Sequence, residues 1–311
     1  MKHNKPSVVV LLAAYNGEQY IAEQLNTIIA QKGVKLSILI SVDKSTDSTL
    51  MIAQDYESKY PDIVTVLPYG DKYGSAGQNF TRLLCDVDFS GYQYISFADQ
   101  DDIWLPDKLQ RAIVELEFNG VDGYSANVTA FWETGREALI KKDYKQVEFD
   151  YLFESPGPGC TFVFNRRLAL SLKKHLLSKK DDLNKLWLHD WYCYSFARFN
   201  EFKWFIDSVP LMKYRQHSSN EVGANDGWAS FKNRLKVILS GDGFSKVLTQ
   251  AYFIGQSELE PIKLIKNRSR FSMFRLLFVS WKCRRQFSHK MMLSVACLLF
   301  IIIGCSYRDS E

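Results

Sequence analysis

The 311-residue sequence lacks the features that mark several large classes of protein. Its six cysteines form no CxxC pair and no metal-binding spacing, so we expect reduced thiols in a cytosolic compartment. The first apolar run, 8–14, is short and is followed at once by a turn at 15–17, so no signal peptide is expected. No internal repeat or low-complexity tract is present. The apolar fraction of 46% and the charged fraction of 24% are typical of a globular protein and exclude a disordered chain.

Acidic residues are missing from the C-terminal part of the chain. Between Glu260 and Asp309 there is no Asp or Glu, whereas ten Lys or Arg occur, although the net charge of the whole chain is only +4. A basic segment of this kind indicates an anionic surface, either membrane or nucleic acid. Because its charges are interleaved with long apolar runs, the pattern favours lipid, and no nucleic-acid partner is expected.

The apolar segment 291–305 lies within this basic part, between Lys290 and Arg308. It falls short of the roughly 20 residues that span a bilayer comfortably. It predicts a short span, a re-entrant piece or an in-plane anchor, with a buried helix as the alternative. The neighbouring Arg284 and Arg285 would suit anionic headgroups and favour contact with a membrane.

Strand and helix patterns alternate through the first half of the chain. Strands are predicted at 8–14, 36–42, 63–67 and 92–98, and helices at 18–30, 45–60, 78–85 and 106–118. This alternation predicts an α/β fold with a mostly parallel sheet covered on both faces. Ligands bind such sheets beyond the carboxyl ends of the strands. Asn16, Asp43 and Asp99 each follow a strand, so we expect them at one rim of the sheet.

The second half has a less regular pattern. It predicts a hairpin or variable binding loop at 121–149, a hinge at 156–160, helices at 166–177 and 186–199, a strand at 202–206 and a polar loop at 214–222. After Trp228 the pattern is one of basic, apolar helices.

Three carboxylates occupy four residues directly after the strand at 92–98: Asp99, Asp101 and Asp102. They repel one another unless a cation or a proton holds them. Hard divalent ions such as Mg²⁺ or Mn²⁺ suit oxygen ligands of this kind and normally bring phosphate oxygens with them. The alternative is a polar loop in which Asp102 or Asp107 caps the following helix.

Several motifs occur in a fixed order along the chain. They are Ala14-Tyr15-Asn16-Gly17, Ser41-Val42-Asp43-Lys44-Ser45-Thr46-Asp47, Asp99-Gln100-Asp101-Asp102-Ile103-Trp104, Gly159-Cys160-Thr161, His189-Asp190-Trp191 and Tyr214-Arg215-Gln216-His217. In this order they resemble the inverting family 2 glycosyltransferases of the GT-A fold, and within that family the bacterial rhamnosyltransferase-like branch that builds surface polysaccharides. The resemblance covers roughly residues 7–225.

The resemblance implies where a nucleotide-diphosphate sugar would bind. The backbone of Ala14, Tyr15 and Asn16 would line the base and ribose pocket, and Asp43 would hydrogen-bond the base. Donor contacts are also expected from the segment Asp99-Gln100-Asp101, whose two aspartates match the DxD motif.

The resemblance also implies the metal and the base. Asp101 would ligate Mg²⁺ or Mn²⁺, Asp99 would help through the ribose or a metal-bound water, and His217 would approach the metal and diphosphate. Asp190 matches the catalytic base. The alternatives are that Asp190 only caps its helix and that His217 is a solvated loop residue.

Acceptor or sugar contacts are assigned to His189, Trp191, Asp102 and Trp104. The aromatic rings could stack on sugar faces, with packing as the alternative. Asp102 could instead orient Asp101, and Asp47 is expected to cap its helix.

One departure from the family pattern is visible. The family usually has two aspartates and a glycine after the second strand, whereas this chain has Val42-Asp43-Lys44. Lys44 replaces a residue suited to positive φ, and it could instead reach a phosphate. The departure supports the alternative of a weakly active or silent nucleotide-sugar-binding scaffold on the same fold. A nucleotidyltransferase is disfavoured, because the first loop lacks a Gly-rich, Lys- or Arg-bearing segment.

Together the resemblance predicts a metal-dependent inverting enzyme that uses dTDP-rhamnose or a UDP-hexose. The acceptor would be a lipid-linked saccharide in O-antigen or capsule synthesis. Residues 1–227 would form the GT-A domain, with a donor half at 1–120 and an acceptor half at 121–227. Residues 228–311 would form a helical tail on the inner face of the plasma membrane, as a peripheral or monotopic contact. Neither the sugar nor the oligomeric state can be predicted from the sequence.

Overall fold

The computed structural model describes residues 5–217 and 241–304. The described residues fall into two compact units, the first from the ranges 5–143, 156–184 and 188–217, and the second from 144–155, 185–187 and 241–304. The second unit therefore takes in two short segments that precede the expected tail. The predicted boundary between 227 and 228, like Trp228 itself, lies outside the described residues, and the two-domain division stays a prediction.

The first unit is built on a seven-stranded sheet with the order β10-β6-β9-β4-β1-β2-β3. Its strands are β1 (Ser7–Ala14), β2 (Lys35–Val42), β3 (Val64–Val66), β4 (Tyr94–Ala98), β6 (Gly123–Ala126), β9 (Val163–Asn165) and β10 (Trp204–Asp207). All neighbouring pairs are parallel except that β9 runs antiparallel to β4 and β6. The predicted α/β fold with a mostly parallel sheet is confirmed, and β6 is a strand that the sequence patterns missed.

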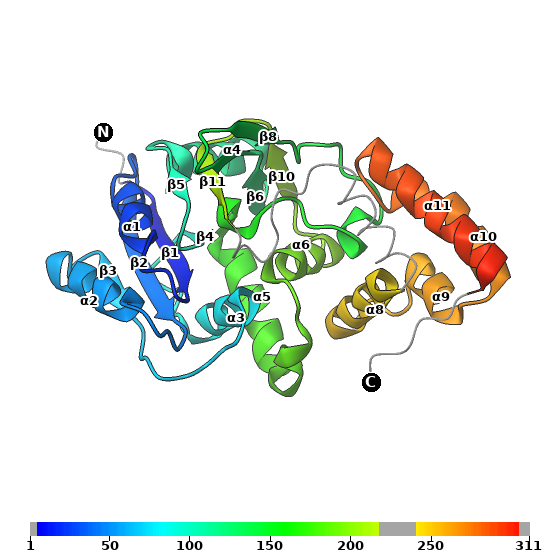
Figure 1. Cartoon of the computed structure of the whole chain (residues 1–311), viewed down its shortest axis with the longest axis horizontal. Coiled ribbons are helices and arrows are strands. Elements are labelled where there is room, and N and C mark those ends of the chain that lie inside the picture. Colours follow the sequence, from blue (N-terminus) through cyan, green and yellow to red (C-terminus); the bar gives the residue numbers. More distant parts are fainter. Residues whose placement is uncertain (1–4, 218–240, 305–311) are drawn as a thin grey trace. The chain divides into compact units, whose positions relative to one another are not determined.

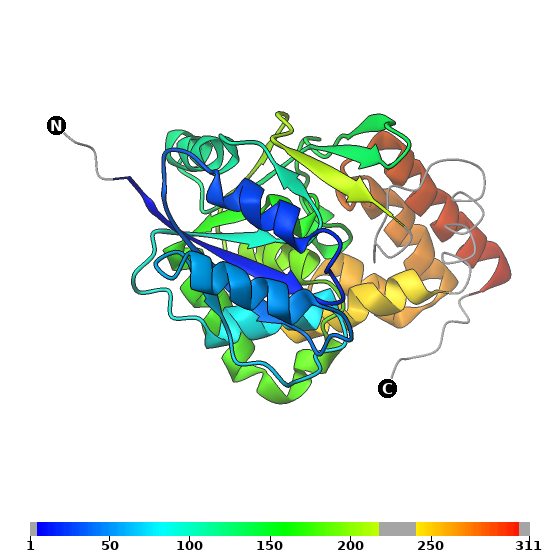
Figure 2. The ribbon, with the colours of Figure 1, turned by 60° about the vertical axis from the view of Figure 1, so that its left-hand side comes forward.

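Helices cover the sheet as the alternating pattern predicts. They are α1 (Ile21–Ile29), α2 (Thr49–Lys59), α3 (Ala76–Asp86), α4 (Lys108–Asn119), α5 (Arg166–Ser178) and α6 (His189–Phe199). Figure 2 shows the blue helices α1 and α2 lying over β1 and β2. Leu12 of β1 shares a core with Leu25 of α1, whereas Phe97 of β4 packs against Phe80 of α3, with ring centroids 5.0 Å apart.

A second sheet in the same unit has the order β5-β11-β7-β8, with β5 (Ile103–Trp104), β7 (Val128–Trp132), β8 (Glu137–Ile140) and β11 (Met212–Gln216). The antiparallel pair β7 and β8 bears out the hairpin expected in 121–149. The polar loop predicted at 214–222 is wrong in its first part, because Tyr214 to Gln216 belong to β11, and residues 218–222 lie outside the described chain. Pairing of β11 with β5 is antiparallel and places the chain near Gln216 beside the segment that follows β4 (Figure 1).

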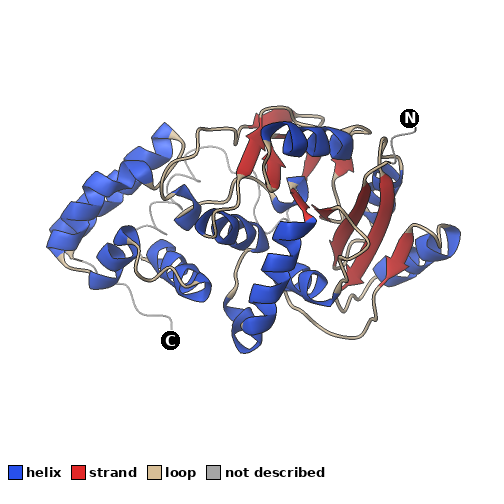
Figure 3. Cartoon of the chain, turned by 180° about the vertical axis from the view of Figure 1, so that it is seen from behind, coloured by secondary structure: helices blue, strands red, loops and turns tan. Residues whose placement is uncertain are grey.

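Residues 241–304 of the second unit are mostly helical, as Figure 3 shows by its blue ribbons. Residues 144–155 and 185–187 are mainly loops and turns. Its helices are α8 (Asp242–Ile254), α9 (Glu260–Asn267), α10 (Arg270–Val279) and α11 (Phe287–Ile303), and α10 packs along α11. The apolar segment predicted from 291 falls in α11. Over the described ranges, none of the helices combines the length and the apolar content needed to cross a membrane.

A buried ion cluster holds the second unit together. The Arg285 side chain is 3% exposed, and its Nη1 lies 3.1 Å from Oδ2 of the fully buried Asp150. Its Nε lies 3.6 Å from Oε1 of Glu154, and Arg284 and His289 also face that carboxylate. The expectation that Arg284 and Arg285 bind lipid headgroups is therefore wrong for Arg285, because its guanidinium is enclosed and paired.

Replacement of Arg285 by Met should lower the free energy of unfolding by about 3–5 kcal/mol, because the buried Asp150 carboxylate would lose its cation. Chemical denaturation measures this loss. Lys282→Met is the matched control, since the Lys282–Glu148 pair is exposed on both sides and its loss should leave the free energy of unfolding nearly unchanged. Equal effects of the two substitutions would contradict the role given to the cluster.

The same cluster predicts a pH dependence. Burial raises the pKa of Glu154, but His289, Arg284 and Arg285 outweigh it and lower this pKa from 4.5 to about 2. A lowered pKa means that the stabilisation is fully present above the unfolded value and is lost as the pH falls from 4.5 towards 2. Denaturation of the wild type and of Glu154→Gln over that range measures it, and the variant should show the shallower pH dependence.

Candidate active site

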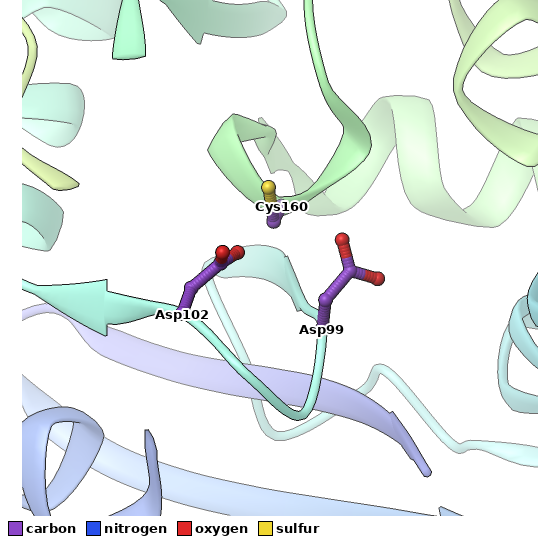
Figure 4. Close-up of side chains that lie close together, drawn as sticks. All are labelled: Asp99, Asp102 and Cys160. Atoms are coloured by element: carbon purple, nitrogen blue, oxygen red, sulfur yellow. The ribbon is translucent and has the colours of Figure 1, made fainter. Parts of the chain in front are cut away.

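The acidic loop lies between β4 and β5, at the carboxyl end of β4. Asp99 and Asp102 stand at the two ends of this loop and rise towards Cys160 of the short turn Gly159–Thr161 (Figure 4). The potential ligand atoms of these three residues all lie within 4.8 Å of one another. Two motifs that are 60 residues apart in the sequence are thus joined at one rim.

Burial divides the acidic loop into an inner and an outer part. Asp102 is fully buried, and burial, followed by the charges of Asp101 and Asp99, raises its pKa well above the ordinary value. Burial likewise raises the pKa of the Cys160 thiol, which stays protonated. A soft, protonated thiol does not suit Mg²⁺ or Mn²⁺, so we assign Cys160 and Asp102 to the support of the loop. The predicted sugar contact of Asp102 is wrong in this structure, because its side chain is closed off from solvent.

Lys108 is a buried cation beside the loop that the sequence patterns missed. Its Nζ lies 3.4 Å from the centroid of the Trp104 ring and makes no hydrogen bond within the described chain. Burial lowers the pKa of Lys108 to about 7, and the neighbouring Asp102 carboxyl acts against this shift. Trp104 is only 2% exposed, so its predicted contact with a sugar is not supported, and the packing alternative holds. The same applies to Trp191, which is 6% exposed.

Strand β11 fastens the acidic loop from the other side. The backbone N–H of Arg215 donates to Oδ1 of Asp102 at 3.2 Å, and its Nε donates to the carbonyl of Asp101 at 2.7 Å. His217 Nε2 lies 2.8 Å from Oδ2 of Asp101, and its ring stacks on Tyr20 with centroids 5.5 Å apart. The structure therefore brings His217 to Asp101. It also shows that Arg215, which the sequence analysis named in the motif without a role, holds the acidic loop.

Gln100 connects the acidic loop to the loop after β1. Its Oε1 accepts from the Tyr15 N–H at 2.8 Å, and its Nε2 donates to the Tyr15 carbonyl at 2.9 Å. A Cβ at Gly17 would collide with this amide, so the glycine is required by a close approach. Asn16 has a φ of 45° and its Oδ1 accepts from the Thr46 N–H at 2.9 Å, which fixes the loop against the chain after β2.

Asp43 lies at the end of β2, next to the loop formed by residues 71–74. Its carboxylate, which is 3% exposed, accepts from the backbone N–H groups of Lys44, Tyr73 and Gly74 at 2.7 to 2.9 Å. These hydrogen bonds hold the Asp43 carboxylate in place. Its contact with the nucleotide base stays a prediction. Lys44 has a negative φ, so this position does not need a residue suited to positive φ.

Asp190 lies in the first turn of α6, where a carboxylate is favoured by the helix dipole. It is not the helix cap, because the cap position is Leu188. The ring of the preceding His189 stacks on the Phe80 ring, with centroids 4.0 Å apart. Burial lowers the pKa of His189 to about 3, so its side chain is neutral and shapes the site. Gly159 touches His189, and through this contact the start of α6 is held beside the Cys160 turn. Ser48 occupies the cap position of α2 without a capping bond, whereas Oδ1 of Asp47, the expected cap, accepts from the Thr49 N–H at 3.0 Å.

The outer residues of the rim fit a hard divalent cation. Asp101 offers carboxylate oxygens and His217 offers an imidazole nitrogen, donors that suit Mn²⁺ and, less well, Mg²⁺, whereas the potential ligand atom of Asp99 groups with those of Asp102 and Cys160. The 2.8 Å approach of His217 to Asp101 shows that both side chains reach the same point.

Comparison with known protein families gives the family of this chain. Residues 9–170 match the family model described as glycosyl transferase family 2. This chain belongs to glycosyl transferase family 2. The glycosyltransferase is 41% identical over 290 residues to the dTDP-rhamnosyl transferase RfbG of Shigella flexneri. The matched region covers 93% of this chain and 100% of that relative. It is 24% identical over 186 residues to the Escherichia coli glucosyltransferase WfgD, covering 58% of this chain and 68% of WfgD.

Solved structures show the same GT-A fold. TarS of S. aureus in complex with UDP-GlcNAc has a TM-score of 0.56 and 16% identity, covering 95% of this glycosyltransferase and 80% of that chain. The mannosyltransferase PcManGT of Pyrobaculum calidifontis, in complex with GDP-Man and Mn²⁺, has a TM-score of 0.50 and 14% identity, covering 100% and 89%. At these identities the likeness concerns the fold alone.

Gly159→Ala should displace His189 and with it Asp190, because the added Cβ would collide with the His189 ring. We expect turnover to fall by about tenfold or more, with nucleotide binding retained, as measured by initial rates and by nucleotide titration. Gly91→Ala is the control, since nothing lies near a Cβ at that position. An unchanged rate in Gly159→Ala would show that His189 does not position the start of α6.

Proposed function

We propose that this glycosyltransferase transfers rhamnose from dTDP-rhamnose to a saccharide acceptor with inversion of configuration. The acceptor is a lipid-linked saccharide of a bacterial surface polysaccharide, such as O-antigen or capsule, at the cytoplasmic face of the membrane. The observation that carries the proposal is the meeting of Asp101 with His217 at the carboxyl end of β4. The 41% identity to a dTDP-rhamnosyl transferase supports the sugar, and a UDP-hexose is the second candidate donor.

Mg²⁺ or Mn²⁺ would be held by Asp99, Asp101 and His217. When bound, such an ion supplies charge neutralisation for the leaving nucleoside diphosphate. Arg215 keeps this end of the site in place by its bond to the Asp101 carbonyl. Asp102 and Cys160, buried behind the loop, prevent its collapse without ligating the ion.

The donor base is assigned to the pocket between the loop after β1 and Asp43. Ala14, Tyr15 and Asn16 would line it, with the Tyr15 backbone fixed by Gln100. Because Asp43 already accepts three backbone hydrogen bonds, a base N–H would take its remaining acceptor position.

Asp190 is proposed as the general base. Its carboxylate would accept the proton of the acceptor hydroxyl, whose oxygen attacks the anomeric carbon as the bond to the diphosphate breaks. A single displacement of this kind inverts the configuration. The neutral His189 next to it cannot compete for the proton, because burial keeps its pKa low.

Asp101→Ala and Asp190→Asn should each lower the transfer rate by about a thousandfold or more. Asp190→Asn should still bind the donor, since its role is confined to the acceptor proton. Rates from dTDP-rhamnose with a lipid-linked acceptor, together with titration of the nucleotide, measure both properties. Asp107→Asn is the matched control, because Asp107 is an exposed aspartate in the same segment with no side-chain capping bond.

Wild-type turnover by Asp190→Asn would remove the base assignment. A panel of dTDP-rhamnose and UDP-hexoses tests the sugar separately. Transfer from a UDP-hexose with none from dTDP-rhamnose would overturn the choice of donor and leave the catalytic roles in place.

A further inference from the structure

The second unit presents an apolar face that its own core does not use. Along α10 and the turn that follows it, Phe271, Phe274, Phe278 and Trp281 are 46 to 69% exposed. Their spacing of three and four residues places them on one side of the helix. The opposite side of α10 is buried through Met273 and Leu276, so the exposed aromatic residues are not part of the hydrophobic core.

Helix α11 carries a second stripe of the same kind. Its exposed members share a spacing of three or four residues and are 43 to 69% exposed: Phe287, Met291, Val295, Leu298 and Ile302. The two stripes meet at one end, where the rings of Trp281 and Phe287 form an edge contact with centroids 5.8 Å apart. We call these nine side chains the α10–α11 face. So large a set of exposed apolar groups on two packed helices is typical of a surface that contacts a partner.

The charges around the α10–α11 face indicate the partner. Arg270 reaches the far end of α11, where its Nη2 donates to the Ile302 carbonyl at 3.3 Å. Lys290 lies over the Trp281 ring at the opposite end, with Nζ 5.7 Å from the centroid. Neither cation has a carboxylate within ion-pair distance in the part of the chain that the structure describes. No acidic residue occurs in the sequence from 261 to 308, so a second copy would meet this face with like charge.

We propose that the α10–α11 face lies in the interface of an anionic bilayer, with its aromatic and aliphatic side chains among the acyl chains and Arg270 and Lys290 at the headgroups. An amphipathic pair of helices with basic flanks binds membranes in this in-plane manner. The described helices are too short or too polar to cross a bilayer, which fits this orientation. The inference deepens the proposed function by giving the surface through which the enzyme meets its lipid-linked acceptor. It narrows the sequence expectation for residues 228–311 to the α10–α11 face and excludes the buried Arg285.

Flotation of the full chain with vesicles tests this inference without donor or acceptor. Wild-type protein should float with phosphatidylglycerol–phosphatidylethanolamine vesicles, and much less with phosphatidylcholine vesicles or at high salt. Phe271→Ser combined with Phe278→Ser should reduce the bound fraction by about tenfold. Arg270→Gln combined with Lys290→Gln should abolish the preference for anionic vesicles while retaining part of the binding.

Phe118→Ser is the matched control, because Phe118 is 84% exposed but lies on α4 of the first unit. All variants change exposed positions, so circular dichroism and thermal unfolding should match the wild type. Binding that is unchanged in the Phe271/Phe278 variant, or absent in the wild type, would overturn the inference. A wild-type dimer that this variant converts to a monomer, without vesicle binding, would assign the face to self-association instead. Hydrolysis of dTDP-rhamnose in solution should be unaffected by the variant, so loss of vesicle binding and failure of the proposed reaction are distinguishable.

Discussion

The repulsion among three carboxylates within four residues is the constraint on which the site depends. The protein resolves it by placing the three groups in different environments. Asp102 is buried, with a raised pKa, against the Cys160 thiol and within reach of the Lys108 charge. Asp101 remains partly exposed and meets His217, while the Arg215 backbone and side chain anchor the loop between them. The inner part supports the loop, and the outer part is the proposed site of the cation and the diphosphate.

This arrangement explains why distant segments converge at the end of β4. The loop after β1 is fixed by the Gln100 amide, the turn at Cys160 closes the loop from above, and β11 supplies Arg215 and His217. The start of α6, with Asp190, is positioned through the contact between His189 and Gly159. The acidic loop, the Cys160 turn and the start of α6 are thus joined through packing. Membership of glycosyl transferase family 2 places this architecture among sugar-transferring enzymes, while the choice of sugar depends on pocket details that the fold does not determine.

Elements that depend on local sequence patterns could be predicted from the sequence. Those that depend on contacts between distant residues could not. Long apolar runs such as Val8–Ala14 identify strands because burial on both faces leaves a continuous hydrophobic pattern. The short β5 and the polar β11 carry no such pattern, and their pairing joins residues more than 100 positions apart. An aromatic ring beside an acidic motif suits stacking on a sugar or packing, and the buried environment of Trp104 is set by Lys108 and α1. Arg285 was assigned to lipid because the sequence does not reveal that Asp150 and Glu154 enclose it.

The central claim is that the outer acids of the loop and His217 form a metal-dependent nucleotide site. Calorimetric titration of dTDP into the full chain, in chelator and then in Mn²⁺, tests this most directly. We expect Mn²⁺ to strengthen binding by about tenfold or more, and Asp101→Asn to remove this gain while leaving the fold intact. Equal affinity with and without Mn²⁺, or a full gain in Asp101→Asn, would contradict it.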